Sequence, residues 1–587
     1  MSESQNEAPP NSISHLTPEL SQKLKQHFEI ALSDTIQKIG VSRFATESPS
    51  LLAYRNCLPN DESDKVEVFR NTVPLSTYAA YDPFIQKLLE QPCSKQLEVE
   101  NLLAPGYPLF VAPTSATTGK TLRYIPKYVM ANVNPQEGIL ATNKYACFLM
   151  HLGTKGTITV KKDETGAVVT KFPLTQVSAG MARFKMGLGR DENFMGIKVP
   201  YLTSPLAVSF INNYRSFLLM HALFALGERH LEIMYTTFGT IYIDFITLME
   251  EEWDKLLNSI ETGILPDFDD TEHVRSYLQQ HFIANPDRAK ELRSAKPMKE
   301  SPGWLKKIWP DVKECTGIMS GVYSGVLSRM QSYFGPDVKL RSAGYVLSEC
   351  WTGITYNNAI NLYKLAGDDY YEFLPTSQSE ISEEESAEHL VPVWKVQTGK
   401  TYEPVVTTHN GLWRYRSEDM VKIMGFELTN GFPIISFVQR RQDEIRLTDD
   451  MVHTRLPGTV LTNAIFSTTE DTIGRVVEFT SYLDTRPEVP TVGYVVELDG
   501  DIGPNPALAR QQVLEVLRAQ HVNIPRLIDT NKMSLPTIRV VKHGAFADYR
   551  HWRVESLGIS VTQVKVPTVI KDETLLERLL KGIVYEA

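Results

Sequence analysis

The hydrophobic pattern divides the chain into a helix-rich part, a strand-rich part and a mixed C-terminal part. Apolar residues recur at helical spacing from Glu19 to Ile39, with Gly40 as the expected stop, and again from 203 to 262. Short apolar runs separated by turn residues between 391 and 440 predict an antiparallel β layer. Beyond them, strand-like and helical segments alternate and predict a compact α+β unit.

The expected fold is α/β: a large N-terminal domain of α/β layers with an attached small β barrel-like layer, and a smaller α+β C-terminal domain. Polar residues in RRQDEIRLTDD are the best hinge candidate between the two domains. We expect four segments: a disordered tail at 1–20, the large domain at 21–440, the hinge at 441–446 and the small domain at 447–587.

Composition narrows the class of protein. The 587 residues are 42% hydrophobic and 22% charged, with a net charge of −10, which is typical of a soluble globular chain. No basic block indicates a nucleic-acid surface. The apolar segment 216–227 is too short to span a membrane, and the first 20 residues lack the pattern of a secretory signal. Five cysteines without a CxxC pair favour reduced thiols, so we expect a cytoplasmic protein with no membrane partner.

The segment PTSATTGKTLRYIP, residues 113–126, follows a strand-like run and predicts a phosphate-binding loop. Lys120 or Arg123 would supply the positive charge. A P-loop is disfavoured because its pattern requires glycine at position 114. A polar surface turn between two strands remains open as an alternative. The hydroxyl and glycine positions expected to contact phosphate are Thr114, Ser115, Thr117, Thr118 and Gly119.

Three later segments carry further candidate chemistry. In GYVLSECWTGI, Tyr345 could stack on a base, and Glu349 could hold Mg²⁺ against phosphates, although a capping or ion-pairing role is the default for such a glutamate. Asp419 could accept hydrogen bonds from ribose hydroxyls, or simply end a strand. Lys565 is the one charge in GISVTQVKVP, where a surface lysine is the simpler interpretation.

Taken in order, these segments resemble motifs of the adenylate-forming superfamily, and more closely the acyl acid amido synthetases first known as plant auxin-responsive (Gretchen Hagen family) proteins. TSATTGKTLRYIP, the Tyr-x-x-Ser-Glu-Cys string from Tyr345 to Cys350, YYEFLP and TTHNGLWRYRSEDMVKIMGF each match a family string. Beyond residue 20, the resemblance covers nearly the whole chain. The departures from the family strings are Ala116 for glycine, Arg123 for lysine, Glu418 for glycine and Thr568 for arginine.

The resemblance implies an ATP-dependent, Mg²⁺-using ligase that adenylates a small carboxylic acid and passes the acyl group to an amine, expected to be an amino acid. It also implies a mobile C-terminal domain that rotates about a hinge containing Arg441 and Asp443, and we expect a monomer. The implied site comprises Lys565 and Arg123 as catalytic residues, Glu349 as the metal ligand, and Thr114, Ser115, Thr117, Thr118, Gly119, Tyr345, Ser348, Glu349, Asp419 and Arg441 as nucleotide-binding residues.

Two rival functions remain open at this point. Ala116 adds a methyl group where the backbone would approach phosphate, so the protein could bind a nucleotide or acyl group as a regulator without turnover. Alternatively, the acyl group could pass to coenzyme A and form a thioester.

Overall fold

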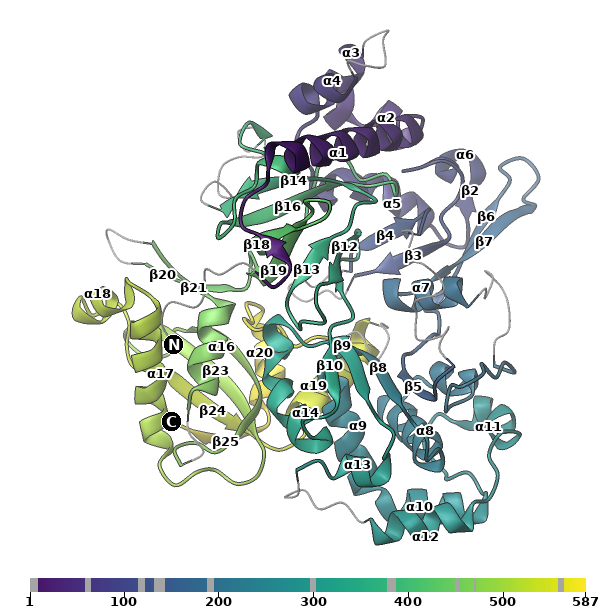
Figure 1. Cartoon of the computed structure of the whole chain (residues 1–587), viewed down its shortest axis with the longest axis vertical. Coiled ribbons are helices and arrows are strands. Elements are labelled where there is room, and N and C mark those ends of the chain that lie inside the picture. Colours follow the sequence, from purple (N-terminus) through teal and green to yellow (C-terminus); the bar gives the residue numbers. More distant parts are fainter. Residues whose placement is uncertain are drawn as a thin grey trace.

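A computed structural model describes residues 9–58, 65–114, 122–130, 143–186, 195–295, 302–376, 387–448, 453–468, 471–557 and 564–587. It confirms the expected α/β fold, with a large N-terminal domain and a smaller C-terminal one (Figure 1). The predicted phosphate contacts Ser115, Thr117, Thr118 and Gly119 lie outside these described residues, as does Ala116.

The N-terminal helices cover one side of the large domain. Helix α1 begins after Thr17, whose side chain accepts a hydrogen bond from the Leu20 amide, and ends at Gly40 as expected. A Cβ atom at Gly40 would lie 2.6 Å from the Ile36 carbonyl oxygen, which explains glycine there. The helices of this region are α1 (Pro18–Ile39), α2 (Arg43–Glu47), α3 (Leu52–Asn56), α4 (Lys65–Thr72), α5 (Tyr78–Leu88) and α6 (Gln96–Val99).

Part of the expected disordered tail has a defined conformation. Residues Ser12–Ile13 form strand β1, which pairs with Glu427 and Phe426 on strand β18. The Tyr356 hydroxyl donates to the carbonyl oxygen of Asn11 at 2.8 Å. The polar composition of this segment concealed a backbone pairing that depends on a distant strand.

A parallel four-stranded sheet lies in the lower part of the large domain (Figure 1). Its strands, in spatial order, are β10 (Lys339–Arg341), β9 (Glu314–Ile318), β8 (Ile233–Phe238) and β5 (Ala146–Leu149). The helices around it are α8 (Tyr214–Gly227), α9 (Thr240–Glu251), α10 (Trp253–Thr262), α11 (Glu272–Gln279), α12 (Pro286–Ser294), α13 (Leu305–Ile308) and α14 (Val326–Phe334).

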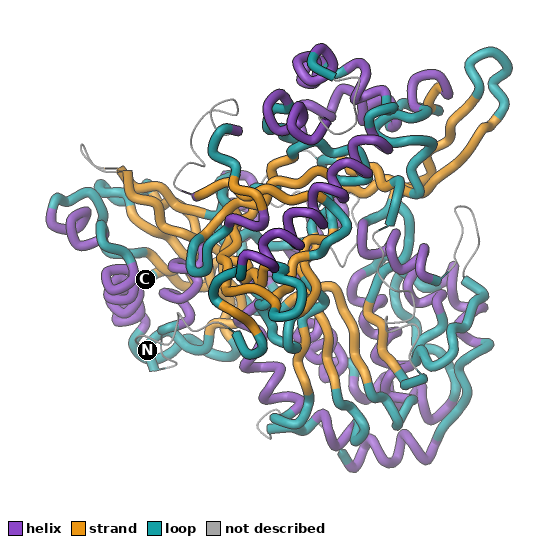
Figure 2. The backbone as a smooth tube through the Cα atoms, turned by 45° about the horizontal axis from the view of Figure 1, so that its top comes forward, coloured by secondary structure: helices purple, strands orange, loops and turns teal. Residues whose placement is uncertain are grey.

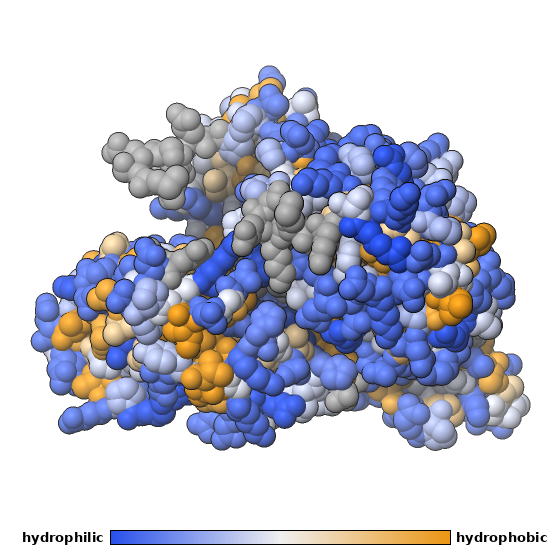
Figure 3. Space-filling view, turned by 90° about the horizontal axis from the view of Figure 1, so that it is seen from below, coloured by the Kyte–Doolittle hydropathy of each residue, from blue (hydrophilic) through white to orange (hydrophobic). Residues whose placement is uncertain are grey.

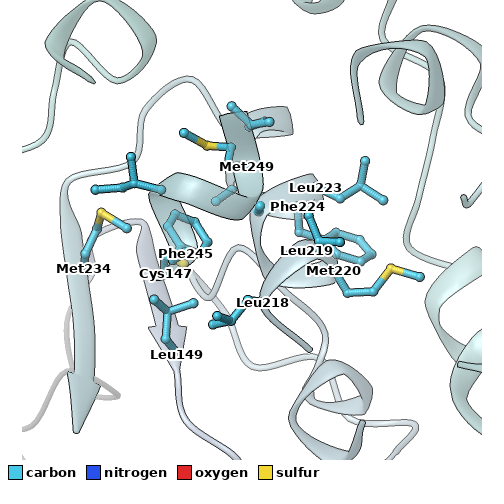
Figure 4. Packing of buried hydrophobic residues seen from close by; sticks show 14 of the residues in the cluster. Cys147, Leu149, Leu218, Leu219, Met220, Leu223, Phe224, Met234, Phe245 and Met249 are labelled. Carbon is cyan, nitrogen blue, oxygen red and sulfur yellow. The ribbon is translucent and has the colours of Figure 1, made fainter. Parts of the chain in front are cut away.

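Helix α8 is the centre of the largest hydrophobic core, as its apolar pattern predicted. Figure 4 shows Leu218 of this helix beside Leu149 of β5, while Leu219 and Leu223 lie next to Phe224 and Met220 of the same helix. The helical zone predicted at 203–262 is interrupted at β8, where Ile233–Phe238 forms a buried strand. The sequence IMYTTF is rich in β-branched and aromatic residues, which suit a strand between two parallel neighbours.

A second sheet of the large domain, with five strands, carries the predicted phosphate-binding loop. Strands β3 and β4 form an antiparallel pair in which Pro113 lies opposite Tyr124. The Thr114 amide donates to the Arg123 carbonyl oxygen at 2.8 Å, which extends this pairing by one residue on each strand. The strand order is β2 (Ser94–Lys95), β6 (Gly156–Lys161), β7 (Val168–Leu174), β3 (Phe110–Pro113) and β4 (Tyr124–Lys127), with helix α7 (Val177–Lys185) following β7.

The predicted β layer is the larger part of an antiparallel ten-stranded sheet (Figures 1 and 2). Its main path runs β11 (Tyr345–Val346), β12 (Trp351–Thr355), β13 (Tyr363–Leu365), β19 (Pro433–Arg440), β18 (Asp419–Glu427), β16 (Thr401–Thr407), β14 (Tyr370–Pro375) and β15 (Val391–Pro392). Strand β17 (Tyr415–Arg416) pairs with β16, and β1 pairs with β18.

Buried ion pairs hold the chain that leads into β18. The guanidinium of Arg414 donates to both carboxylate oxygens of Glu372 at 2.8 Å, and Arg416 binds Glu403 at 2.6 Å. Gly411, with φ of +92°, approaches so closely that a Cβ there would lie 2.0 Å from the Leu103 carbonyl oxygen. These contacts fix the segment immediately before Asp419.

The C-terminal domain packs beside the large domain, at the left of Figure 1. A hairpin of β20 (Glu444–Thr448) and β21 (His453–Pro457) leads from β19 into helix α16 (Gly458–Phe466). The domain's own four-stranded sheet has the order β22 (Val476–Asp484), β23 (Thr491–Leu498), β24 (Thr537–Val541) and β25 (Ile583–Glu586). Its other helices are α17 (Pro506–Gln520), α18 (Ile524–Asp529), α19 (Ala545–Leu557) and α20 (Glu573–Leu580).

A largely buried arginine joins the two domains. Arg550 of α19 lies 3.1 Å from both carboxylate oxygens of Asp244 on α9, and its other terminal nitrogen lies 2.6 Å from Glu478 on β22. The Tyr214 hydroxyl also donates to Asp244 at 2.7 Å. One guanidinium therefore bridges a carboxylate of the large domain and a carboxylate of the C-terminal domain.

The surface seen from below is mostly hydrophilic, with small separate hydrophobic patches (Figure 3). No helix within the described ranges is long and apolar enough to cross a membrane.

Candidate active site

A cavity of about 480 Å³ lies where the two domains meet. Tyr345 and Asp419 line it from the ten-stranded sheet, and Lys565 lines it from the C-terminal domain. Three residues from distant segments of the sequence, each predicted to belong to the site, therefore line the same cavity.

Asp419 is held by two neighbours within this cavity. The Tyr345 hydroxyl donates to Oδ2 at 2.7 Å, and Nε of Arg440 lies 3.2 Å from Oδ1. Arg440 is in register with Asp419 across β18 and β19, so the strand pairing itself sets this contact. Burial raises the pKa of the Asp419 carboxyl, while Arg440 and Tyr345 favour its charged form.

One oxygen of Asp419 remains available to a ligand. Oδ1 is buried and accepts no hydrogen bond within the described part of the chain, although the Arg440 guanidinium is near it. Oδ1 has this ion pair and can still accept a hydrogen bond from a ligand hydroxyl in the cavity.

Hydrogen bonds to strand β22, at the edge of the C-terminal sheet, fix the position of the segment that carries Lys565. The Ser481 amide and hydroxyl both donate to the Thr568 carbonyl oxygen, at 2.7 and 2.6 Å, and the Thr480 hydroxyl donates to the Pro567 carbonyl oxygen at 2.7 Å. These bonds fasten the segment after Lys565 to strand β22. The lysine itself then reaches toward the large domain.

The Lys565 ammonium lies against aromatic rings of the large domain. Nζ is 4.5 Å from the Phe238 ring centroid and 5.9 Å from that of Tyr323. Burial, together with repulsion from Arg440, lowers the pKa of Lys565 to about 8, and the carboxylates of Asp419 and Asp443 oppose this shift. The ammonium is thus positioned beside the cavity without a close carboxylate among the described residues.

Glu349 lies near this cavity but does not line it. The Tyr415 hydroxyl donates to its Oε1 at 3.3 Å. Removal from solvent raises the pKa of Glu349, while Arg440 and Lys127 favour its charged form. Ser348, its neighbour in sequence, is half-buried and also lies outside the cavity lining. Within the described ranges, no cluster of three or more metal-ligating side chains occurs.

The ends of the predicted phosphate-binding loop lie beside the Asp419 segment. The Arg123 guanidinium is 3.8 Å from the carboxylate of Glu418 and 5.7 Å from the ring centroid of Tyr78. The Thr114 amide donates to the backbone carbonyl oxygen of Arg123. The structure therefore brings Arg123 to the residue that precedes Asp419.

The structure separates Arg441 from the cavity and places Arg440 in it. Successive strand residues point to opposite faces, so Arg440 faces Asp419 while the Arg441 guanidinium lies 3.9 Å from Glu403. Asp443 also lines the cavity, and burial raises its pKa to about 6. Sequence reasoning missed Arg440, which the strand alternation after Asp419 could have indicated once the pairing register was known.

The site therefore offers a buried carboxylate with a free oxygen, an arginine beside it and a lysine delivered from the other domain. Such a set can bind hydroxyls and neutralise an anionic group in the same cavity. The fold around it is similar to that of a solved ligase. 2-Hydroxyisobutyryl-CoA ligase, solved in a postadenylation state, has a TM-score of 0.50 at 12% identity, covering 99% of this chain and 98% of that one.

The family is shown by sequence models for three GH3 family domains: the N-terminal domain matches residues 54–339, the central domain 364–440 and the C-terminal domain 459–574. The chain belongs to the GH3 family. It is 24% identical to jasmonoyl–L-amino acid synthetase JAR4 of Nicotiana attenuata over 579 residues, 93% of each protein. The solved GH3.15 acyl acid amido synthetase has a TM-score of 0.74 at 21% identity, covering 97% of this chain and 95% of that one.

Proposed function

We propose that the protein is an ATP-dependent ligase that adenylates a small carboxylic acid and transfers the acyl group to an amino acid, forming an amide. The observation that carries this proposal is the single cavity shared by Asp419 of the large domain and Lys565 of the C-terminal domain. The names of the relatives support it, since JAR4 joins an acyl group to an amino acid and GH3.15 is an acyl acid amido synthetase.

Each residue has a role that follows from its placement. The free Oδ1 of Asp419 accepts hydrogen bonds from ribose hydroxyls, and Tyr345 holds that carboxylate in position. The Lys565 ammonium neutralises charge as the substrate carboxylate bonds to the α-phosphorus and the bond to pyrophosphate breaks. The amine nitrogen then bonds to the acyl carbon, AMP leaves, and the amine gives up a proton.

Glu349 fits the role of a magnesium ligand. Mg²⁺ takes one or two carboxylates and completes its coordination with phosphate oxygens and water, so one protein carboxylate suffices. When bound, the ion would neutralise phosphate charge during adenylation. Thr114, Ser115, Thr117, Thr118 and Gly119 remain our proposed phosphate contacts, with Arg123 as a positive charge at the end of that loop and Ser348 beside Glu349.

We also propose that the enzyme acts in the cytoplasm as a monomer. Its five cysteines are free, which suits a reducing compartment. The acidic net charge of −10 gives no surface for nucleic acid.

Mass spectrometry of the products tests the proposed reaction. We expect the protein, incubated with ATP, Mg²⁺, a panel of carboxylic acids, mixed amino acids and coenzyme A, to form acyl amides together with AMP. Thioester products in place of amides would identify coenzyme A as the acceptor instead. ATP binding without any acid-dependent pyrophosphate exchange would identify a regulator and reject the proposal.

The adenylation rate should depend on pH through Lys565. Its pKa of about 8 means that the ammonium is present below pH 8 and is lost as the pH rises through that value. We therefore expect acid-dependent pyrophosphate exchange to fall above pH 8. A Lys565→Arg variant keeps its charge at higher pH, so any activity it retains should not show this decline. The same decline in both proteins would assign the titration to another group.

A further inference from the structure

A second cavity, of about 260 Å³, lies next to the first, and both are lined by Val346 and Leu347. Its walls come mostly from the five-stranded sheet, helix α7 and the start of the ten-stranded sheet. The apolar residues that line it besides these two are Phe110, Val129, Met130, Val177, Met181 and Trp351. Its polar lining residues are Lys38, Lys127, Asp368, Asp369, His409 and Asn410, so the cavity combines apolar and polar walls, as a small-molecule site can.

A buried ammonium lines this cavity. Lys127, on strand β4, is only 5% exposed. Its Nζ donates to the backbone carbonyl oxygen of Glu349 at 2.7 Å. Within the described part of the chain, no carboxylate lies within 4 Å of it. An ammonium has three N–H donors, so this bond leaves donor capacity for a ligand.

Burying an ammonium without an anionic partner destabilises the folded protein. A buried charge that lacks a partner costs several kcal/mol, and proteins normally pair it or leave it at the surface. The missing partner is an anion of a size that the cavity can hold.

Two buried polar residues around the cavity, Asp369 and Asn410, are already engaged, whereas Lys38 and Asp368, which also line it, are exposed. Oδ1 of Asp369 accepts a hydrogen bond from the His409 amide at 3.1 Å, and the His409 ring lies 3.4 Å from the same oxygen. Oδ1 of Asn410 accepts from the amides of Tyr128 and Val129 at 2.7 and 2.9 Å. Among the buried groups of this wall, Lys127 is therefore the cation with donors left for a ligand.

We propose that this second cavity binds the acid substrate, and that Lys127 neutralises a second anionic group on it, so that the preferred substrates are small dicarboxylic acids. This inference rests on the proposed adenylation function. The reacting carboxylate must reach the first cavity, where Lys565 already supplies a cation. Lys127, which lines only the second cavity, is left for an anionic group at the other end of the molecule.

The cavity volume restricts the size of the acid. Pockets for drug-sized ligands span about 300 to 1,000 Å³, so a cavity of about 260 Å³ suits a small acid. The apolar walls would then contact the carbon chain between the two carboxylates.

A matched pair of substrates tests the inference. Each dicarboxylic acid of a short series is compared with its own monomethyl ester, which has nearly the same shape but only one charge, by acid-dependent pyrophosphate exchange. We expect kcat/KM of the wild type to be at least tenfold higher for the diacid, because a charge-assisted hydrogen bond contributes about 1.5 to 3 kcal/mol.

Lys127→Gln is the informative variant. Its amide can still donate to the Glu349 carbonyl oxygen, but the charge is gone, so the diacid-to-monoester ratio should fall to about one. Lys38→Gln is the control, since Lys38 lines the same cavity yet is exposed, and water screens its charge. That variant should retain the wild-type ratio. Circular dichroism and a cooperative thermal transition establish that each variant folds.

Binding gives a second readout that needs no turnover. The diacid should raise the melting temperature of the wild type and have no such effect on Lys127→Gln. Equal kcat/KM for the diacid and its ester in the wild type would overturn the inference, as would equal losses with both substrates in Lys127→Gln. If no acid supports exchange, the proposed function fails, and the diacid-induced shift in melting temperature still decides whether Lys127 binds an anion.

Discussion

Asp419→Ala is expected to weaken ATP binding by about 100-fold or more. The substitution removes a buried carboxylate that we assign to the ribose hydroxyls, and a hydrogen bond to a charged group contributes about 1.5 to 3 kcal/mol. It also leaves Arg440 facing the cavity without its carboxylate partner. Isothermal titration with a nonhydrolysable ATP analogue measures the effect directly.

The control for this variant is Tyr345→Phe. It keeps the aromatic ring and removes only the hydroxyl that donates to Asp419, so affinity should fall by a factor of about five. Thermal unfolding should establish that both variants fold. Unchanged affinity in Asp419→Ala would remove this residue from the nucleotide site.

Lys565→Ala should slow adenylation by about 100- to 1,000-fold. The loss of one preorganised positive charge beside the reacting groups has an effect comparable to the loss of an oxyanion donor. The side chain packs against the rings of Phe238 and Tyr323 and makes no ion pair within 4 Å among the described residues, so its removal should leave the fold intact. Single-turnover formation of acyl-adenylate, followed by quenching and chromatography, measures this step.

Chemically prepared acyl-adenylate separates the two half-reactions in this variant. When the adenylate and an amino acid are supplied, amide formation should be reduced far less than adenylation, because Lys565 is assigned to the first step. Adenylation at the wild-type rate would remove Lys565 from the mechanism. Equal losses in both steps would indicate a general distortion of the interface between the domains.

The sequence predicted the elements that depend on local pattern. Helix α1 has a hydroxyl cap, a proline at its first position and a glycine stop, all of which can be read within 24 residues. Strand β8 was misassigned because its apolar residues continue the helical pattern of α8. Its β-branched and aromatic residues suit a strand, but its position between two parallel strands, a tertiary property, decides the assignment.

The sequence likewise predicted only the site residues that local strings indicate, and not those that depend on tertiary structure. Tyr345, Asp419 and Lys565 stand in recognisable strings, so the sequence alone could nominate them. Arg440 was missed because its importance comes from the register of β18 with β19. Lys127 was missed because a lysine in a short strand is ordinary until its burial is known.

Arg550 limits how the two domains can diverge. One guanidinium, that of Arg550, binds Asp244 in one domain and Glu478 in the other. Replacing any one of these three residues alone would therefore leave a buried charge without its partner. A chimera that joins this large domain to the C-terminal domain of a relative would therefore need a matched residue at position 550. Domain shuffling within the family is thus constrained by one shared side chain as well as by the catalytic residues.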